Sequence, residues 1–309
     1  MPPSHGVGLR AAMAVRAKLA SWPADILYLD SVSSPYAIVL ATVAAPVKVV
    51  VRLSYLECYP RPSVLARALY RSPRIELILS DIAPERARDQ LTKRWLGNKI
   101  TVLPSGHSTD WYKTDVDLQA FGIPDGAFTV AIMSEQPDDA GLKWLVACAH
   151  WIPMDLPIHF LLIAPESSHG PVRRLIRKMP FTQRFHLCTN VEEAPGLLAS
   201  SSLAVITDWG AELQRRACMQ CLAVGVPVLG ADAAGIRDVI QPEVNGELLP
   251  ADDPEPLAHS IFELYEDKER RAMLSAGARR SARQWPSMHQ QLLQMRSAFE
   301  RVLAASSEQ

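Results

Sequence analysis

The sequence lacks any hydrophobic run long enough to cross a membrane. The longest apolar run covers residues 36–47, well short of the about 20 residues that a spanning helix needs. The N-terminus has no hydrophobic region typical of a secretory signal, and its basic first 24 residues contain too few serines for a typical transit peptide. We therefore expect a cytoplasmic protein, and a chain of 309 residues is long enough for two domains.

Cysteine is scarce as well. The 5 cysteines are scattered and odd in number, which is typical of a reducing compartment where thiols serve as small apolar side chains. Cys218 and Cys221 form a CxxC pair, but no further ligands follow at the spacing of a zinc site. We expect this pair to pack within a helix, and we expect neither a metal site nor a cofactor.

The chain has little net charge, −1, but that charge is unevenly spread. Residues 1–120 hold 15 Lys and Arg against 10 Asp and Glu, and residues 121–309 hold 17 against 23. Within the basic half, 59–74 combines arginines with apolar residues. This segment is either a solvated helix or a peripheral contact with the anionic inner face of a membrane. No interleaved basic and aromatic pattern predicts nucleic-acid binding.

What the chain does contain is an alternation of short apolar runs and helical patterns. Runs of Val, Ile and Leu without polar alternation are typical of strands covered on both faces of a parallel sheet. We predict such strands at 26–29, 47–53, 77–79, 100–103, 130–133, 159–164, 185–188, 203–206 and 226–230. Helical patterns accompany them at 84–95, 142–151, 171–178, 193–199 and 254–264. The order predicts an α/β protein with doubly wound sheets.

A polar stretch with Gly and Pro, at 104–126, separates two such regions. We expect an N-terminal domain over 1–118, a second domain over 119–287 and a terminal helix over 288–309 that packs back on the first. The first domain has few strands and no Gly-rich strand–helix turn, so we expect it to be incomplete. In doubly wound sheets, ligands bind beyond the carboxyl ends of the strands.

The most specific signals lie between Glu212 and Pro250. A helix that starts near Glu212 offers unpaired N–H groups and a partial positive charge, which suit a phosphate. Gly225 is expected to end this helix, Pro227 to stiffen the entry into the next strand, and Gly235 to let the backbone approach a ligand closely.

This stretch resembles the C-terminal domain of family-four retaining glycosyltransferases, within the glycosyl transferases group 1. The resemblance implies the GT-B fold, in which two Rossmann-like domains face each other across a cleft, and it implies a nucleotide-sugar donor and no obligatory metal. The residues that carry it are Glu212, Gln220 and the blocks 223–228, 235–240 and 245–250, with further matches at 102–111, 141–145 and 284–285.

The resemblance implies roles for single residues of the donor site. Glu212 is the expected catalytic residue, close to the reacting carbon of the donor sugar. Gln220 replaces a carboxylate that binds the ribose, which is expected to weaken binding by about 1–3 kcal/mol. Gly141 matches a glycine near the diphosphate, and Gly235 lies in the donor-side block. Ala140 stands where a phosphate-binding lysine is usual.

Two cations are candidates to replace that lysine. Lys143 lies one turn into the helix that starts near Gly141, and Arg215 lies in the first turn after Glu212, so either could reach the diphosphate. The alternative is that Arg215 and its neighbour Arg216 are solvated surface residues.

On the acceptor side, Ser54 stands where the family often has a histidine. Arg52 lies beside it, and His107 in the hinge is a further candidate. The expected activity is a hexosyl-type transfer, with retention, from a nucleoside diphosphate sugar to a hydroxyl of a glycan, lipid-linked or small-molecule acceptor. The alternative is a weakly active or inactive glycosyltransferase-like scaffold, partner protein or gene fragment. An epimerase of the same fold fits the 212–250 pattern less well.

Overall fold

The chain is described here by a computed structural model. It describes residues 5–22, 24–29, 47–54, 75–80, 100–103, 106–107, 116–133, 139–164, 169–177, 181–188, 193–206, 211–232, 236–250 and 253–307. The chain divides into two compact units, one formed by 1–106 with 286–309 and the other by 107–285. We call them the N-terminal unit and the C-terminal unit.

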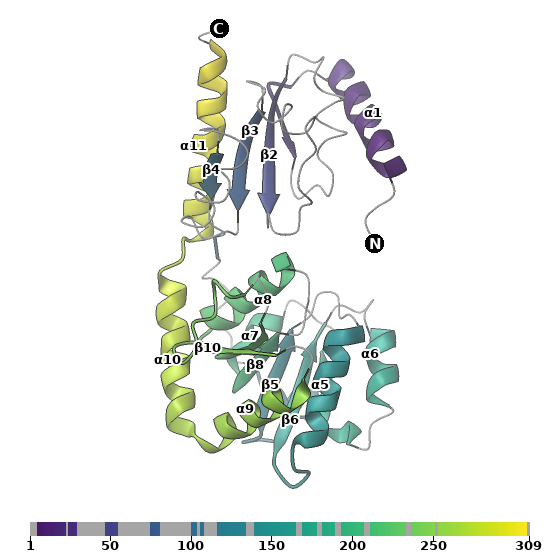
Figure 1. Cartoon of the computed structure of the whole chain (residues 1–309), viewed down its shortest axis with the longest axis vertical. Helices are drawn as coiled ribbons and strands as arrows, with labels where there is room; N and C mark the ends of the chain where they lie inside the picture. Colours follow the sequence, from purple (N-terminus) through teal and green to yellow (C-terminus); the bar gives the residue numbers. More distant parts are fainter. Residues whose placement is uncertain are drawn as a thin grey trace. The chain divides into compact units, whose positions relative to one another are not determined.

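The N-terminal unit contains a parallel sheet of four strands in the order β1-β2-β3-β4 (Figure 1). The terminal helix α11 (Met288–Ser307) packs on this sheet, where Ala298 and Val302 meet Val50 and Leu103 in a small core. The helix therefore buries an apolar stripe against strands that lie far from it in sequence. The bounds are α1 His5–Ser21, β1 Ile26–Leu29, β2 Lys48–Ser54, β3 Ile75–Ser80 and β4 Ile100–Leu103.

The C-terminal unit contains a six-stranded parallel sheet in the order β10-β9-β8-β5-β6-β7. Its strands are β5 Phe128–Met133, β6 Ile158–Ile163, β7 Phe185–Cys188, β8 Leu203–Ile206, β9 Val228–Ala231 and β10 Gly246–Leu249. Strands β6 and β7 follow β5 on one side of it, and the next strand along the chain, β8, pairs with β5 on its other side. The order of strands thus reverses between β5 and β8.

Both faces of this sheet are buried, as the unbroken apolar runs predict. Val130 and Ile132 of β5 point into one core, and Ala131 and Met133 point into the other. Helices α5 and α9 cover the first face, and α7 and α8 cover the second. The helices are α5 Asp139–Trp151, α6 His169–Ile176, α7 Ala194–Ala199, α8 Ala211–Ala223, α9 Pro254–Glu266 and α10 Lys268–Arg283.

The nine predicted strands are all present, and their ends differ from the prediction by at most two residues. Among the described elements, α1, β10, α10 and the short 3-10 helices η4 (Leu118–Phe121) and η6 (Thr182–Arg184) had not been predicted. The predicted helix at 84–95 lies outside the described residues. Gly225 ends α8 as expected, because its φ of 85° is a left-handed conformation that glycine adopts without strain.

Candidate functional site

The reversal of strand order marks the place where a ligand is expected in the C-terminal unit. In open α/β sheets, ligands bind beyond the carboxyl ends of the strands at this switch point. Here β5 and β8 pair in parallel, with Val130 opposite Leu203 and Ile132 opposite Val205. Their carboxyl ends therefore lie at the same edge of the sheet. Helix α5 starts after β5 and α8 starts after β8, so both helix N-termini lie at that edge.

On α5, the predicted donor residues lie in the first two turns. Gly141 is buried and Lys143 is exposed. Lys143 forms no ion pair with the described residues, so its ammonium group is available to an anion at this edge. Ala140 supplies no charge, and its side chain lies outside the described part of the structure.

On α8, Glu212 occupies the first turn, as the sequence predicts. The structure describes its backbone but not its side chain. Arg215 is half-buried and Arg216 is exposed. The interpretation of both arginines as solvated surface residues therefore fits Arg216 better than Arg215.

Three side chains of α8 carry buried polar atoms without hydrogen-bond partners in the described part of the chain. They are Oε1 and Nε2 of Gln214, Nε and Nη1 of Arg215, and Oε1 of Gln220. Gln214 is the most extreme, because its side chain is 0% exposed. Buried polar groups in folded proteins nearly always have a partner, so each exception needs an explanation. A polar ligand at the N-terminal half of α8 would supply one for Gln214 and Arg215.

Gln214 continues the core-facing side of α8. It lies one turn before Cys218, and Cys218 and Cys221 are fully buried in the core between α8 and the sheet. Burial raises the pKa of the Cys218 thiol and raises the pKa of Cys221 to about 12, so both thiols stay protonated and apolar in character. The two cysteines thus contribute packing to α8.

The 223–250 block owes its pattern largely to packing. Asn245 is fully buried, accepts a hydrogen bond from the backbone N–H of Gln241 at 2.8 Å, and donates to the carbonyl of Val239 and the hydroxyl of Ser281. Gly246 lies so close to Val228 that a Cβ atom would come within 2.1 Å of its carbonyl oxygen. These residues fix the turn into β10, which is a role in folding. Gly235 lies outside the described residues.

The residues predicted for the acceptor side lie in different units of the structure. Arg52 and Ser54 lie at the carboxyl end of β2, the edge where a parallel sheet binds ligands, and their side chains are not described. His107 packs edge-on against Trp285, with ring centroids 5.9 Å apart. This contact gives His107 a structural role. The basic segment 59–74 lies outside the described residues.

Within the described ranges, no helix has the length and apolar character to span a membrane. The same ranges contain no group of three His, Cys, Asp or Glu side chains placed to hold a metal ion.

Comparison with known proteins identifies the C-terminal unit. The family of glycosyl transferases group 1 matches residues 127–267. The C-terminal unit is therefore similar to a group 1 glycosyltransferase domain over these residues. Over 92 residues the chain is 33% identical to a D-inositol 3-phosphate glycosyltransferase of Salinispora tropica, and over 87 residues it is 37% identical to one of Thermobispora bispora. These matches cover 30% and 27% of this chain but only 19% and 20% of the relatives, so they span about a fifth of those proteins.

Solved structures of glycosyltransferases resemble the chain over nearly its whole length. A glycosyltransferase of Rickettsia africae covers 98% of this chain and 83% of its own, with a TM-score of 0.75 and 14% identity. Anabaena Alr3699/HepE in complex with UDP and glucose covers 97% of this chain and 84% of its own, with a TM-score of 0.74 and 19% identity. The chain thus has the GT-B fold, and the expected fold class is confirmed.

Sequence reasoning missed one buried polar residue near the β5/β8 edge. Gln214 escaped notice because a glutamine in a helix that also carries Arg215 and Arg216 is indistinguishable from a surface residue. The spacing of Gln214 from Cys218, one helical turn, was the sequence feature that could have predicted its burial. When a polar residue has the spacing of the buried residues of an amphipathic helix, either the buried face has been assigned wrongly or the polar group has a hydrogen-bond partner.

Proposed function

We propose that this protein is a retaining glycosyltransferase that moves a sugar from a nucleoside diphosphate sugar to a hydroxyl acceptor. The observation that carries the proposal is the combination at the β5/β8 edge. The N-termini of α5 and α8 both follow strands that end at this edge, and Lys143 of α5 and the unpartnered polar atoms of Gln214 and Arg215 in α8 lie within the first two turns of these helices, which supports a ligand there.

Each candidate residue has a defined task in this proposal. Glu212 contacts the donor sugar, and Gln220 binds the ribose with an amide in place of a carboxylate. Arg215 stabilises the departing diphosphate together with Lys143 and the α8 N-terminus. A guanidinium with free N–H groups and a helix dipole stabilise charge that develops on a leaving diphosphate, and neither needs a metal ion. Arg215 thus supplies the positive charge that a lysine at the position of Ala140 would otherwise provide.

The acceptor side belongs to the N-terminal unit, with Arg52 and Ser54 at the end of β2. Because the basic segment 59–74 is part of the same unit, we include a peripheral contact with an anionic membrane and a cytoplasmic location in the proposal. Acceptors of lipid-linked type fit that contact.

The competing function is a scaffold or partner protein that kept the fold and lost donor binding. The absence of charge at Ala140 and Gln220 favours it. The two functions differ in one property, because a glycosyltransferase must bind a nucleoside diphosphate.

Calorimetry with UDP, GDP and ADP tests the proposal, and UDP comes first because HepE was solved with it. A nucleotide at about 100 times its Kd stabilises the protein by about 2.7 kcal/mol, which raises the Tm by about 5–10 °C. Arg215→Ala should remove at least half of this rise, since one charge-assisted hydrogen bond is worth about 1.5–3 kcal/mol.

Arg216→Ala is the matched control, because it removes the same charge from the next position on the exposed side of α8. It should leave the nucleotide-induced rise unchanged. No rise with any of the three nucleotides would exclude the glycosyltransferase and leave the scaffold function.

A further inference from the structure

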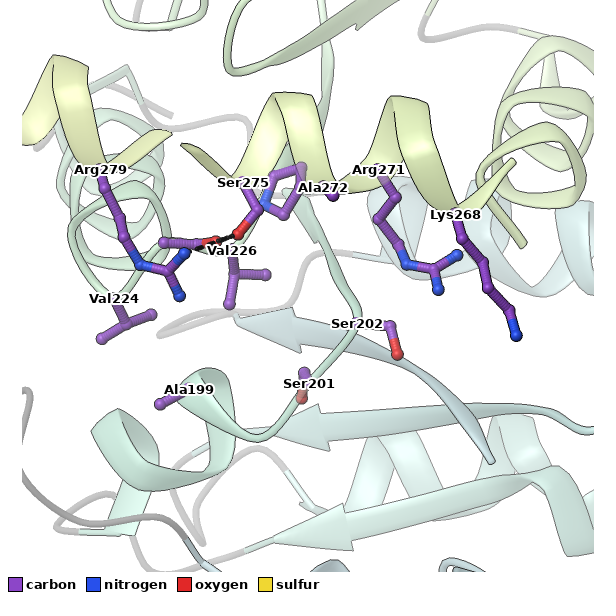
Figure 2. Close-up of a pocket in the computed structure, with 12 residues that line it drawn as sticks. Ala199, Ser201, Ser202, Val224, Val226, Lys268, Arg271, Ala272, Ser275 and Arg279 are labelled. Atoms are coloured by element: carbon purple, nitrogen blue, oxygen red, sulfur yellow. Dashed lines mark hydrogen bonds between the residues drawn. The ribbon is translucent and has the colours of Figure 1, made fainter. Parts of the chain in front are cut away.

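A basic pocket lies at the opposite edge of the C-terminal sheet, where β8 and β9 begin. It has a volume of about 290 Å³ and is enclosed by the end of α7, the turn after α8 and one side of α10. Figure 2 shows Lys268, Arg271 and Arg279 extending from α10 toward the loops, with Ser201 and Ser202 on the facing wall. Because the β5/β8 edge lies at the carboxyl ends of the same strands, this pocket is separate from it.

The cations come from one face of α10. Lys268, Arg271, Ser275 and Arg279 follow one another at intervals of three or four residues, which places them in a row on a helix. The row runs along the whole length of the pocket. A single helix thus presents three positive charges and one hydroxyl to the same hollow.

These three cations are not neutralised by the described residues. Lys268, Arg271 and Arg279 form no ion pair there. Their neighbour Arg270 provides the contrast, since it points to another side of α10 and binds the carboxylates of Glu243, Glu247 and Glu263 at 2.7 to 3.1 Å.

The acidic group nearest the pocket is Asp267, whose charge partly offsets the lowering of the Arg271 pKa by burial. Asp267 caps α10 by accepting the backbone N–H of Arg270 at 2.8 Å, and no Asp or Glu lines the pocket. The positive potential of the pocket therefore persists, and it is strengthened near Lys268 by the N-terminus of α10.

Two of the cations are held in place by bonds that leave other N–H groups available. Nη1 of Arg271 donates to the carbonyls of Leu264 and Tyr265, and the guanidinium lies over the ring of Phe128, 5.1 Å from its centroid. Nη1 of Arg279 donates to the hydroxyl of Ser275 at 3.2 Å. Such fixed guanidinium groups lose little freedom when an anion binds.

The facing wall adds a hydroxyl donor. Ser202 Oγ accepts the backbone N–H of Thr129 at 3.4 Å, and its own proton has no acceptor in the described part of the chain. The carbonyl of Gly225, which would otherwise repel an anion, is occupied by the hydroxyl of Ser275 at 2.6 Å. The Ser202 hydroxyl thus adds a donor, and the Gly225 carbonyl is already satisfied.

We propose that this pocket binds a phosphate monoester group. A phosphate dianion offers several oxygens to neighbouring cations of the row and to the hydroxyl of the facing wall, whereas a carboxylate offers fewer and carries half the charge. The volume lies near the lower end of the about 300–1,000 Å³ typical of ligand pockets, which suits a phosphorylated headgroup or small metabolite. The proposal is independent of the glycosyltransferase activity.

Isothermal titration with inorganic phosphate in a phosphate-free buffer of low ionic strength tests this pocket. We expect saturable binding that weakens about tenfold in Lys268→Gln, because one charge-assisted contact is lost. Lys268 is the first residue of α10 and is exposed, so this variant keeps the fold. Arg279→Gln is the second variant and should also weaken binding, because it removes another of the three charges that line the pocket.

The control is Arg280→Gln, which removes an exposed arginine of α10 that does not line the pocket. It should bind phosphate like the unmodified protein. Equal weakening by Arg280→Gln and Lys268→Gln would overturn the proposal, because it would indicate attraction by overall charge. Binding that neither pocket variant changes would also overturn it, since the phosphate would then occupy another place such as the β5/β8 edge.

The source of the phosphate group is distinguished by two further probes. Glucose 6-phosphate represents a free metabolite, and phosphatidylcholine vesicles with phosphatidic acid represent a lipid headgroup, with pure phosphatidylcholine vesicles as reference. Binding of either probe that Lys268→Gln weakens supports the pocket and identifies its source. Failure of inorganic phosphate and both probes to bind refutes it.

Discussion

Replacing Gln214 with methionine should stabilise the protein in the absence of nucleotide. The Gln214 side chain is fully buried, and both of its polar atoms are without partners among the described residues. Protein mutational data put the cost of burying such an amide without compensation at about 1–3 kcal/mol. Methionine has a similar length and volume and no strong hydrogen-bonding group, so the change removes that cost without opening a cavity.

The expected gain is measurable by calorimetry. In a domain of this size each kcal/mol moves the Tm by about 2–4 °C, so Gln214→Met should raise it by about 2–12 °C. Gln119→Met, at an exposed position of the same unit, should change the free energy of unfolding by less than about 0.5 kcal/mol. A lower Tm for Gln214→Met would refute the reasoning, because the amide would then be hydrogen-bonded in the free protein. If Gln214 also contacts the nucleotide, UDP should raise the Tm of the variant by less than it raises the Tm of the unmodified protein.

Gly246→Ala should destabilise the C-terminal unit by more than about 3 kcal/mol, since the new Cβ would clash with the carbonyl of Val228. Gly170→Ala in α6 meets only the Arg174 side chain at 3.6 Å and should be neutral or stabilising in the same urea titration. Burial lowers the pKa values of His159 and His186 below 6.5. The unfolded state therefore binds more protons at these two residues than the folded state does. The stability that the neutral histidines contribute should be complete above about pH 6.5 and should fall as the pH drops through the lowered pKa values. His159→Gln should flatten this loss in Tm scans from about pH 7.5 to 5.5, and an unchanged slope would contradict it.

The buried strands were predictable from sequence because a strand covered on both faces must be apolar throughout, as β5 and β8 are. Helix α10 was not predictable from sequence, because its buried side contains small residues such as Ala278 and Ser281, which lie between many charged residues. Strand β10 has only four residues, and its pairing with β9 depends on the turn that Asn245 fixes. Long-range contacts, which local patterns do not contain, determine both.

The candidate site at the β5/β8 edge was predictable in outline and not in detail. Strand order cannot be read from sequence, so the switch between β5 and β8 became visible only in the sheet. The position of Glu212 in the first turn of α8 followed from the preceding strand and the later Gly225. The burial of Gln214 and Arg215 did not, because burial depends on how α8 packs on α7, α10 and the sheet.

The central claim is that a nucleoside diphosphate binds at the carboxyl ends of β5 and β8. Hydrogen–deuterium exchange of the whole chain, with and without the nucleotide that raises the Tm most, tests it directly. The account predicts increased protection of the first turns of α5, residues 139–143, and of α8, residues 211–216. Unchanged exchange in both segments, with protection elsewhere or nowhere, would contradict it.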